Sequence, residues 1–102
     1  MRFVGALVVA TVLVAAAHAA TTEAAEVTMP ARLFAPRQLD VLVGTTVSWR
    51  NTDTNTHTVT EDEDAFDSGH VRPGGTFSRR FTQQGSFVYH CTIHRFMRGE
   101  VH

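Results

Sequence analysis

The sequence is poor in cysteine and contains no lysine. Its 102 residues include one cysteine, Cys91, and all nine of its basic residues are arginines. A single cysteine cannot close an intramolecular bridge, which excludes a small domain stapled by disulfides. Ten acidic residues offset the arginines, and the longest basic run is the pair Arg79-Arg80. The chain therefore lacks the positive field that a nucleic-acid-binding protein needs, and we expect no nucleic-acid partner.

Helical periodicity is also missing from the chain after its first 26 residues. Short runs of β-branched and aromatic residues recur there between glycine, proline and asparagine turn signals. These runs predict about seven strands, at residues 27–29, 38–43, 45–51, 57–60, 76–82, 86–91 and 99–101. Because each half-exposed strand must bury its apolar face against a second sheet, we expect an all-β fold, a two-sheet Greek-key β-sandwich.

Alternation along these strands assigns side chains to the two faces of each sheet. It places Leu39, Val41 and Val43 together on one face. Cys91 points where the core residues of its strand point, whereas His90 faces the other way. The histidine nearest to the thiol in sequence is therefore not its expected partner.

The first residues have the composition of an export signal. Arg2 gives a positive start, residues 3–17 form an almost unbroken apolar run, and Ala17-His18-Ala19 has the small-x-small form of a signal-peptidase site. We expect a signal peptide over residues 1–19, a leader over 20–26 and one domain over 27–102, exported to a bacterial periplasm. An uncleaved membrane anchor is the alternative, although the run falls short of the roughly 20 residues of a bilayer span.

Three residues with metal-binding side chains lie close together near the C-terminus. Cys91, His94 and Met97 have the spacing Cys-x2-His-x2-Met. Soft sulfur ligands with imidazole select copper over hard cations, and a second histidine completes a set of two His and one Cys with a weak Met ligand. His57 is the best candidate, because its predicted strand can lie beside the Cys91 strand with His57 at the same end.

The same residues carry a resemblance to a known family. Residues 85–100 are similar to the copper loop of the cupredoxins, the small blue copper proteins, and residues 47–51, 57–59, 66–69 and 73–77 extend the similarity. Within the family the amicyanin pattern is the most similar, and those of plastocyanin and pseudoazurin are more distant. The resemblance implies that residues 27–102 form a cupredoxin-like copper-binding domain, with one type 1 copper ion held by His57, Cys91, His94 and Met97. It also implies that both imidazoles bind through Nδ1 and that the electron leaves at the exposed edge of His94.

The chain departs from the family pattern at two places. Many cupredoxins have asparagine after the first ligand histidine, where it ties the ligand loops together, and this chain has Thr58. Prolines flank the second ligand histidine in amicyanin-like loops, and Ile93 and Arg95 stand there in this chain. These differences leave open how the loops are joined and which partner protein is recognised.

The predicted donor set indicates a function in electron transfer. Four protein ligands leave no strong open position for a substrate, so we do not expect an enzyme. We expect a soluble, monomeric carrier that cycles copper between Cu(I) and Cu(II) and docks weakly and transiently with redox partner proteins near His94. The alternatives are a copper-delivery protein with the same ligands and a structural sandwich that binds zinc or nothing.

Other polar and apolar groups have more than one interpretation. Leu33, Phe34, Ile93 and Phe96 are either a docking patch around His94 or ordinary core residues. The acidic run over residues 61–64 is interpreted as solvated surface, and the isolated histidines His70 and His102 as surface residues or weak secondary metal sites. Arg79 shares a strand face with Phe77 and Phe81, which requires either a bulge or a side chain that extends to the rim.

Overall fold

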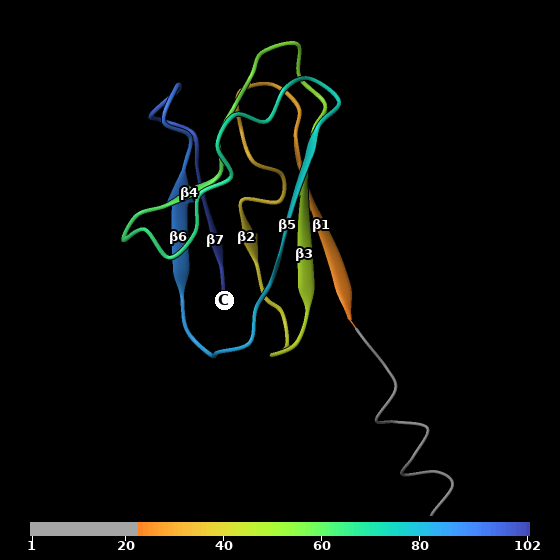
Figure 1. The fold of residues 1–102 in the computed structure, drawn as a ribbon, viewed down its shortest axis with the longest axis vertical. Coiled ribbons are helices and arrows are strands. Elements are labelled where there is room, and N and C mark those ends of the chain that lie inside the picture. Colours follow the sequence, from red (N-terminus) through yellow and green to blue (C-terminus); the bar gives the residue numbers. More distant parts are fainter. Residues whose placement is uncertain (1–22) are drawn as a thin grey trace, which may run out of the picture.

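Residues 23–102 are described by a computed structural model, and the predicted signal peptide over residues 1–19 lies outside the described residues. The described part of the chain forms seven strands (Figure 1): β1 (Ala24–Met29), β2 (Gln38–Leu39), β3 (Thr46–Asn51), β4 (Thr60–Glu61), β5 (Thr76–Arg80), β6 (Phe87–His90) and β7 (Arg98–Val101). Residues 23–102 contain no helix, and so none long and apolar enough to cross a membrane. The prediction of an all-β fold is confirmed.

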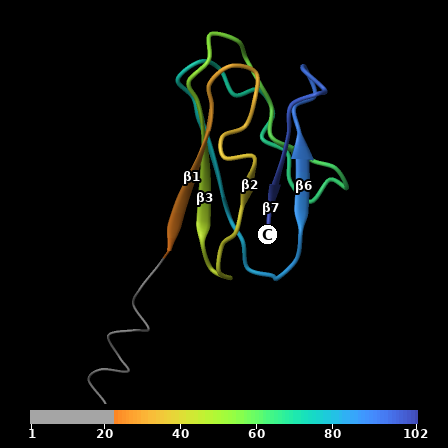
Figure 2. The same ribbon diagram turned by 180° about the vertical axis from the view of Figure 1, so that it is seen from behind.

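The strands form two sheets packed against each other, which Figures 1 and 2 show from opposite sides. One sheet has the order β1-β3-β5 and the other the order β2-β7-β6-β4. The pairs β1-β3 and β2-β7 are parallel, and the other neighbours are antiparallel. Every connection except the one from β6 to β7 passes from one sheet to the other. This crossing pattern confirms the predicted two-sheet sandwich.

Three of the connections meet at one end of the sandwich, the upper end in Figure 1. They lead from β1 to β2, from β3 to β4 and from β6 to β7. The connection from β4 to β5 also returns to this end. The residues with metal-binding side chains lie in these loops, so the sheet topology brings segments far apart in the sequence together.

Each strand differs from its predicted bounds by at least one residue, and the largest differences are in β1, β2 and β4. β1 begins at Ala24, three residues before the expected start of the domain, because the leader residues 24–26 pair with β3. β2 ends at Leu39 and not at the predicted residue 43. The chain turns at Gly44, with φ 96°, and Val43 before it is 55% exposed, whereas Leu39 and Val41 pack against the core, so the prediction that the three share one face is wrong for Val43. The predicted strand at 57–60 corresponds to β4 at Thr60–Glu61, which begins three residues later and ends one residue later.

The core between the sheets is aromatic. Its buried members are Val27, Met29, Phe34, Val47, Trp49, Val59, Phe66, Val71, Phe81, Tyr89, Cys91, Met97 and Val101. Trp49 lies at the centre, with ring centroids of Phe66 and Tyr89 at 5.9 and 5.5 Å from its own. The Trp49 and Tyr89 rings are nearly perpendicular, which is the edge-to-face arrangement that aromatic pairs favour.

Arg79 enters this aromatic layer without a bulge. β5 stays in register with β3 through the pair Val47 and Arg79. The Arg79 guanidinium carbon lies 5.0 Å from the ring centroid of Phe66 and 5.8 Å from that of Phe81. The positive charge is therefore accommodated over the faces of two aromatic rings, a cation–π arrangement.

The acidic run over residues 61–64 is only partly surface. Glu61 is buried, and its carboxylate accepts hydrogen bonds from the backbone N–H groups of Glu63 and Ala65 at 2.7 and 3.0 Å. The interpretation of this run as solvated surface is therefore wrong for Glu61, which holds the turn after β4. Asp62 pairs with His90 on the neighbouring strand.

Candidate metal centre

The loop after β3 is shaped by Asn51. The buried Asn51 side chain donates hydrogen bonds to the carbonyl oxygens of Asn55 and Val71, and its Oδ1 accepts one from the Asp53 N–H. This side chain replaces the backbone partners that the turn lacks, as asparagine does in many turns. Beyond the turn, His57 and Val71 exchange backbone hydrogen bonds of 3.1 and 2.7 Å, which fix the position of His57.

The loop from Cys91 to Met97 closes on itself. The Cys91 N–H donates to the Met97 carbonyl at 3.1 Å, and the Met97 N–H donates to the His94 carbonyl at 2.9 Å. The loop therefore returns Met97 to the core beside the strand end that carries Cys91. Both sulfur-bearing side chains are buried, and His94 is half-buried.

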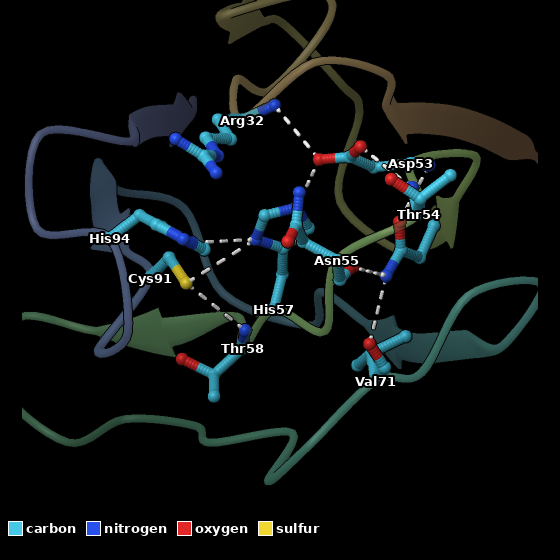
Figure 3. Close-up of polar contacts among 10 residues, drawn as sticks. Arg32, Asp53, Thr54, Asn55, His57, Thr58, Val71, Cys91 and His94 are labelled. Carbon is cyan, nitrogen blue, oxygen red and sulfur yellow. Dashed lines mark hydrogen bonds and ion pairs between the residues drawn. The ribbon is translucent and has the colours of Figure 1, made fainter.

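Three donor atoms converge between these two loops (Figure 3). His57 Nδ1 lies 3.7 Å from Cys91 Sγ and 3.2 Å from His94 Nδ1. All three atoms lie within 4.8 Å of one another, and this is the one group of at least three His, Cys, Asp or Glu donors so arranged in residues 23–102. The sequence predicts that these three residues lie together at one metal site, and the structure brings them together.

The donor set fits a copper ion. Two imidazole nitrogens and a thiol sulfur face one point, and the buried Met97 adds a thioether at the end of the same loop. Thiolate and thioether ligands with imidazole favour copper over magnesium or calcium. The arrangement of His57, Cys91, His94 and Met97 is consistent with a type 1 copper site.

Asp53 fixes the orientation of the His57 ring. Its Oδ2 lies 2.9 Å from His57 Nε2 and accepts a second hydrogen bond from the Arg32 N–H at 3.2 Å. The bond from His57, with smaller contributions from the Thr54 and Arg32 N–H groups, holds the pKa of the Asp53 carboxyl well below its usual range. An ionised carboxylate keeps the proton of His57 on Nε2, which leaves the Nδ1 lone pair free for a metal. The sequence analysis missed Asp53, although its position four residues before a candidate ligand was visible.

Replacement of Asp53 by alanine is expected to weaken copper binding by about 10- to 100-fold, the usual effect of removing such an outer partner. The Nε2 proton then loses its acceptor, and the ring is free to turn or to change tautomer. Competition with a copper chelator measures the affinity. Asp53→Asn is the control, because it keeps an acceptor oxygen and should lose less. Equal affinities for Asp53→Ala and the unmodified chain would contradict this role.

Thr58 joins the two ligand loops. Its backbone N–H donates to Cys91 Sγ at 3.3 Å, and its Oγ1 accepts a hydrogen bond from the Thr92 N–H at 2.9 Å. The Thr58 hydroxyl also lies 3.2 Å from the Thr92 hydroxyl. The link left open by the missing asparagine is therefore made by a threonine, and the N–H directed at sulfur stabilises negative charge there.

The apolar residues near His94 divide into two groups. Phe34 is buried and packs edge-to-face on Tyr89 with ring centroids 4.7 Å apart, so it belongs to the core and not to a docking patch. Leu33, Ile93 and Phe96 are 46%, 45% and 72% exposed.

The remaining histidines lie away from the donor cluster. His90 pairs with Asp62 on the side opposite to Cys91, as strand alternation predicted. His70 and His102 are exposed, and His102 contacts Glu100. Neither of them belongs to a group of three donors among the described residues.

Comparisons with known proteins agree with this geometry. The chain is 38% identical over 69 residues to amicyanin from Paracoccus denitrificans. This match covers 63% of the chain and 53% of the relative, so the chain spans about half of that relative's length. A purple cupredoxin from Nitrosopumilus maritimus is 27% identical with a TM-score of 0.72, covering 76% of this chain and 96% of the other. The Cu(I) form of a methionine-to-alanine mutant of amicyanin is 32% identical with a TM-score of 0.72, covering 79% and 82%.

A copper-containing nitrite reductase from Thermus scotoductus SA-01 also matches, at 28% identity and a TM-score of 0.71, but the match covers only 21% of that larger chain. The model of the cupredoxin-like domain matches residues 3–101. On this match, and on the sandwich and the donors described above, the chain belongs to the cupredoxin family.

Proposed function

We propose that this protein is an exported electron carrier that shuttles single electrons between redox partner proteins. The observation that carries the proposal is the enclosure of the donors: His57 and Cys91 are 0% exposed, Met97 is 1% exposed, and His94 alone is half-buried. A set of four protein donors closed in this way offers no open position for a substrate or a water molecule. The arrangement therefore favours a carrier over an enzyme.

His57, Cys91, His94 and Met97 are the residues that would hold the metal. Bound copper supplies a one-electron couple between Cu(I) and Cu(II). The protein contributes a fixed arrangement of donors: Asp53 orients the His57 ring, and Thr58 directs its N–H at Cys91 Sγ. Donors that move little between the two oxidation states reduce the rearrangement that electron transfer requires.

His94 is the proposed point of contact with partners. It is the most exposed of the four donor residues, and the exposed residues Leu33, Ile93 and Phe96 belong to the adjoining loops. A small apolar contact gives the weak, short-lived docking that a shuttle needs. Export to a bacterial periplasm and a monomeric state complete the proposal, supported by the composition of residues 1–19 and by the similarity to amicyanin.

A visible absorption titration of residues 20–102 with Cu(II), followed by voltammetry, tests the proposal. We expect a strong thiolate-to-copper band that saturates at one equivalent and a fast, reversible one-electron couple. A sluggish couple together with ready transfer of copper to an acceptor protein would favour copper delivery. A colourless protein would favour the zinc or purely structural alternatives.

A further inference from the structure

Charge is unevenly distributed over the described residues. Residues 23–102 contain eight arginines and ten acidic residues, so this part of the chain is acidic as a whole. A groove of about 330 Å³ beside the candidate metal centre is lined by Arg32, Arg37 and Arg98, together with Leu33 and Phe96 and no acidic residue. The lining of this groove therefore has the opposite sign to residues 23–102 as a whole.

A second hollow also adjoins the loop from Cys91 to Met97 and shares Arg98 with the groove. It measures about 360 Å³ and is lined by His90, Thr92, Arg95 and Arg98, with Asp62 as its one acidic residue. Both hollows adjoin the ligand loop, because Phe96 and Met97 line the first and Thr92 and Arg95 line the second. Arg98 lines both. We call Arg32, Arg37, Arg95 and Arg98 the arginine rim.

Most of the arginine rim has no acidic partner within residues 23–102. Arg98 pairs with Asp62. The guanidinium groups of Arg32, Arg37 and Arg95 take part in none of the ion pairs among the described residues. In Figure 3 the Arg32 side chain extends from its backbone contact with Asp53 toward the side on which His94 lies. These charges are therefore available to a molecule that approaches this end.

The arginine rim adjoins an exposed apolar patch of Leu33, Ile93 and Phe96. Phe96 is 72% exposed, and its ring centroid lies 6.3 Å from that of His94. Apolar residues surrounded by charge are typical of protein contact sites. Arginine suits such a rim because its planar fork pairs with carboxylates in a bidentate manner.

We propose that this surface docks a redox protein whose contact face carries carboxylates around an apolar centre. The proposal rests on the proposed electron-carrier function and names the chemistry of the partner. A second copy of this chain docked in the same way is disfavoured, because it would bring two arginine rims together. Charges at the edge of an interface act mainly on the association rate and its salt dependence.

The oxidation kinetics of the reduced, copper-loaded protein test the proposal. The probes are anionic hexacyanoferrate(III) and a cationic tris(phenanthroline)cobalt(III) complex, each over a series of salt concentrations. Arg95→Gln and Arg37→Gln should each slow the anionic oxidant by roughly two- to fivefold at low salt and speed the cationic one, and the differences should vanish at high salt. Arg80→Gln is the matched control, since it removes an equal charge on β5, outside both hollows.

A titration with a short polyglutamate peptide tests the carboxylate preference directly. We expect the amide resonances of Arg95 and Phe96 to shift with polyglutamate and not with polylysine, and Arg95→Gln to weaken the effect. Equal salt dependence in Arg95→Gln and Arg80→Gln would overturn the proposal. So would binding to phosphatidylglycerol vesicles without binding to polyglutamate, which would indicate a membrane surface.

The two proposals fail in different ways. If neither oxidant accepts an electron, the electron-carrier function fails, and the polyglutamate titration alone then decides whether the surface prefers carboxylates. If both oxidants react but the arginine rim has no influence and polyglutamate does not bind, the function stands and the acidic partner is excluded.

Discussion

Cys91→Ser is expected to abolish the visible copper band and most of the stabilisation that copper gives the fold. The buried thiol is the only thiolate donor in the sequence, and its Sγ faces both His57 Nδ1 and the Thr58 N–H. A metal that binds only the folded state raises the free energy of unfolding by about 4 kcal/mol at a free concentration of 1,000 times Kd. Thermal unfolding with and without copper, recorded with the visible spectrum, measures both effects.

Met97→Leu is the matched control for Cys91→Ser. It replaces a buried side chain in the same loop with one of similar volume and removes only the weak donor. We expect this variant to keep a strong band, shifted in position, and to remain stabilised by copper. If copper stabilises Cys91→Ser as much as the unmodified chain, the thiolate is not a ligand and the zinc or structural alternative is favoured.

The candidate site was largely predictable because the types of its metal-binding residues and their spacing in the sequence indicate which side chains can bind one metal ion. Cys91, His94 and Met97 share one short loop, and strand parity directed Cys91 inward and His90 outward. Asp53 was not predicted because its contact with His57 depends on a turn that the Asn51 side chain shapes. Sequence spacing does not record such side-chain bonds.

The fold was predictable to the level of strands and faces, and less so at the strand ends. Alternation shows which face of a strand is apolar, but it does not show where the strand ends, so Val43 was placed on one face with Leu39 and Val41. Phe34 was undecided from the sequence because its burial depends on the loop after β1. The pairing of Thr28 with Ala35 folds that loop back and brings Phe34 onto Tyr89. Glu61 was assigned to the surface because its two partners are backbone N–H groups, which no residue type reveals.

Gly99→Ala is expected to be the most destabilising conservative substitution in the strands that carry the ligand loop. Gly99 lies opposite Tyr89 in the β6-β7 pair, and a Cβ at Gly99 would lie 2.4 Å from the Cζ and hydroxyl oxygen of Tyr89. Glycine in a strand interior often marks such a close approach. Overpacking of this kind costs about 2–3 kcal/mol, which lowers the melting temperature of a domain of this size by roughly 10–20 °C.

A second substitution at Tyr89 separates the steric clash from other effects of Gly99→Ala. Tyr89→Leu removes the ring atoms that the new Cβ would meet, whereas Tyr89→Phe keeps Cζ and Cε1 at 2.4 and 2.8 Å. In chemical denaturation, Gly99→Ala should therefore cost much less in the Tyr89→Leu background and nearly its full amount in the Tyr89→Phe background. Equal costs in all three backgrounds would place the effect in the β7 backbone. The Tyr89 ring packs on Phe34 and Trp49 and lies over Gly99, so the ring fits there only because Gly99 has no side chain. This packing stabilises the β6-β7 pair, and Cys91 and Met97 lie where these two strands join the ligand loop.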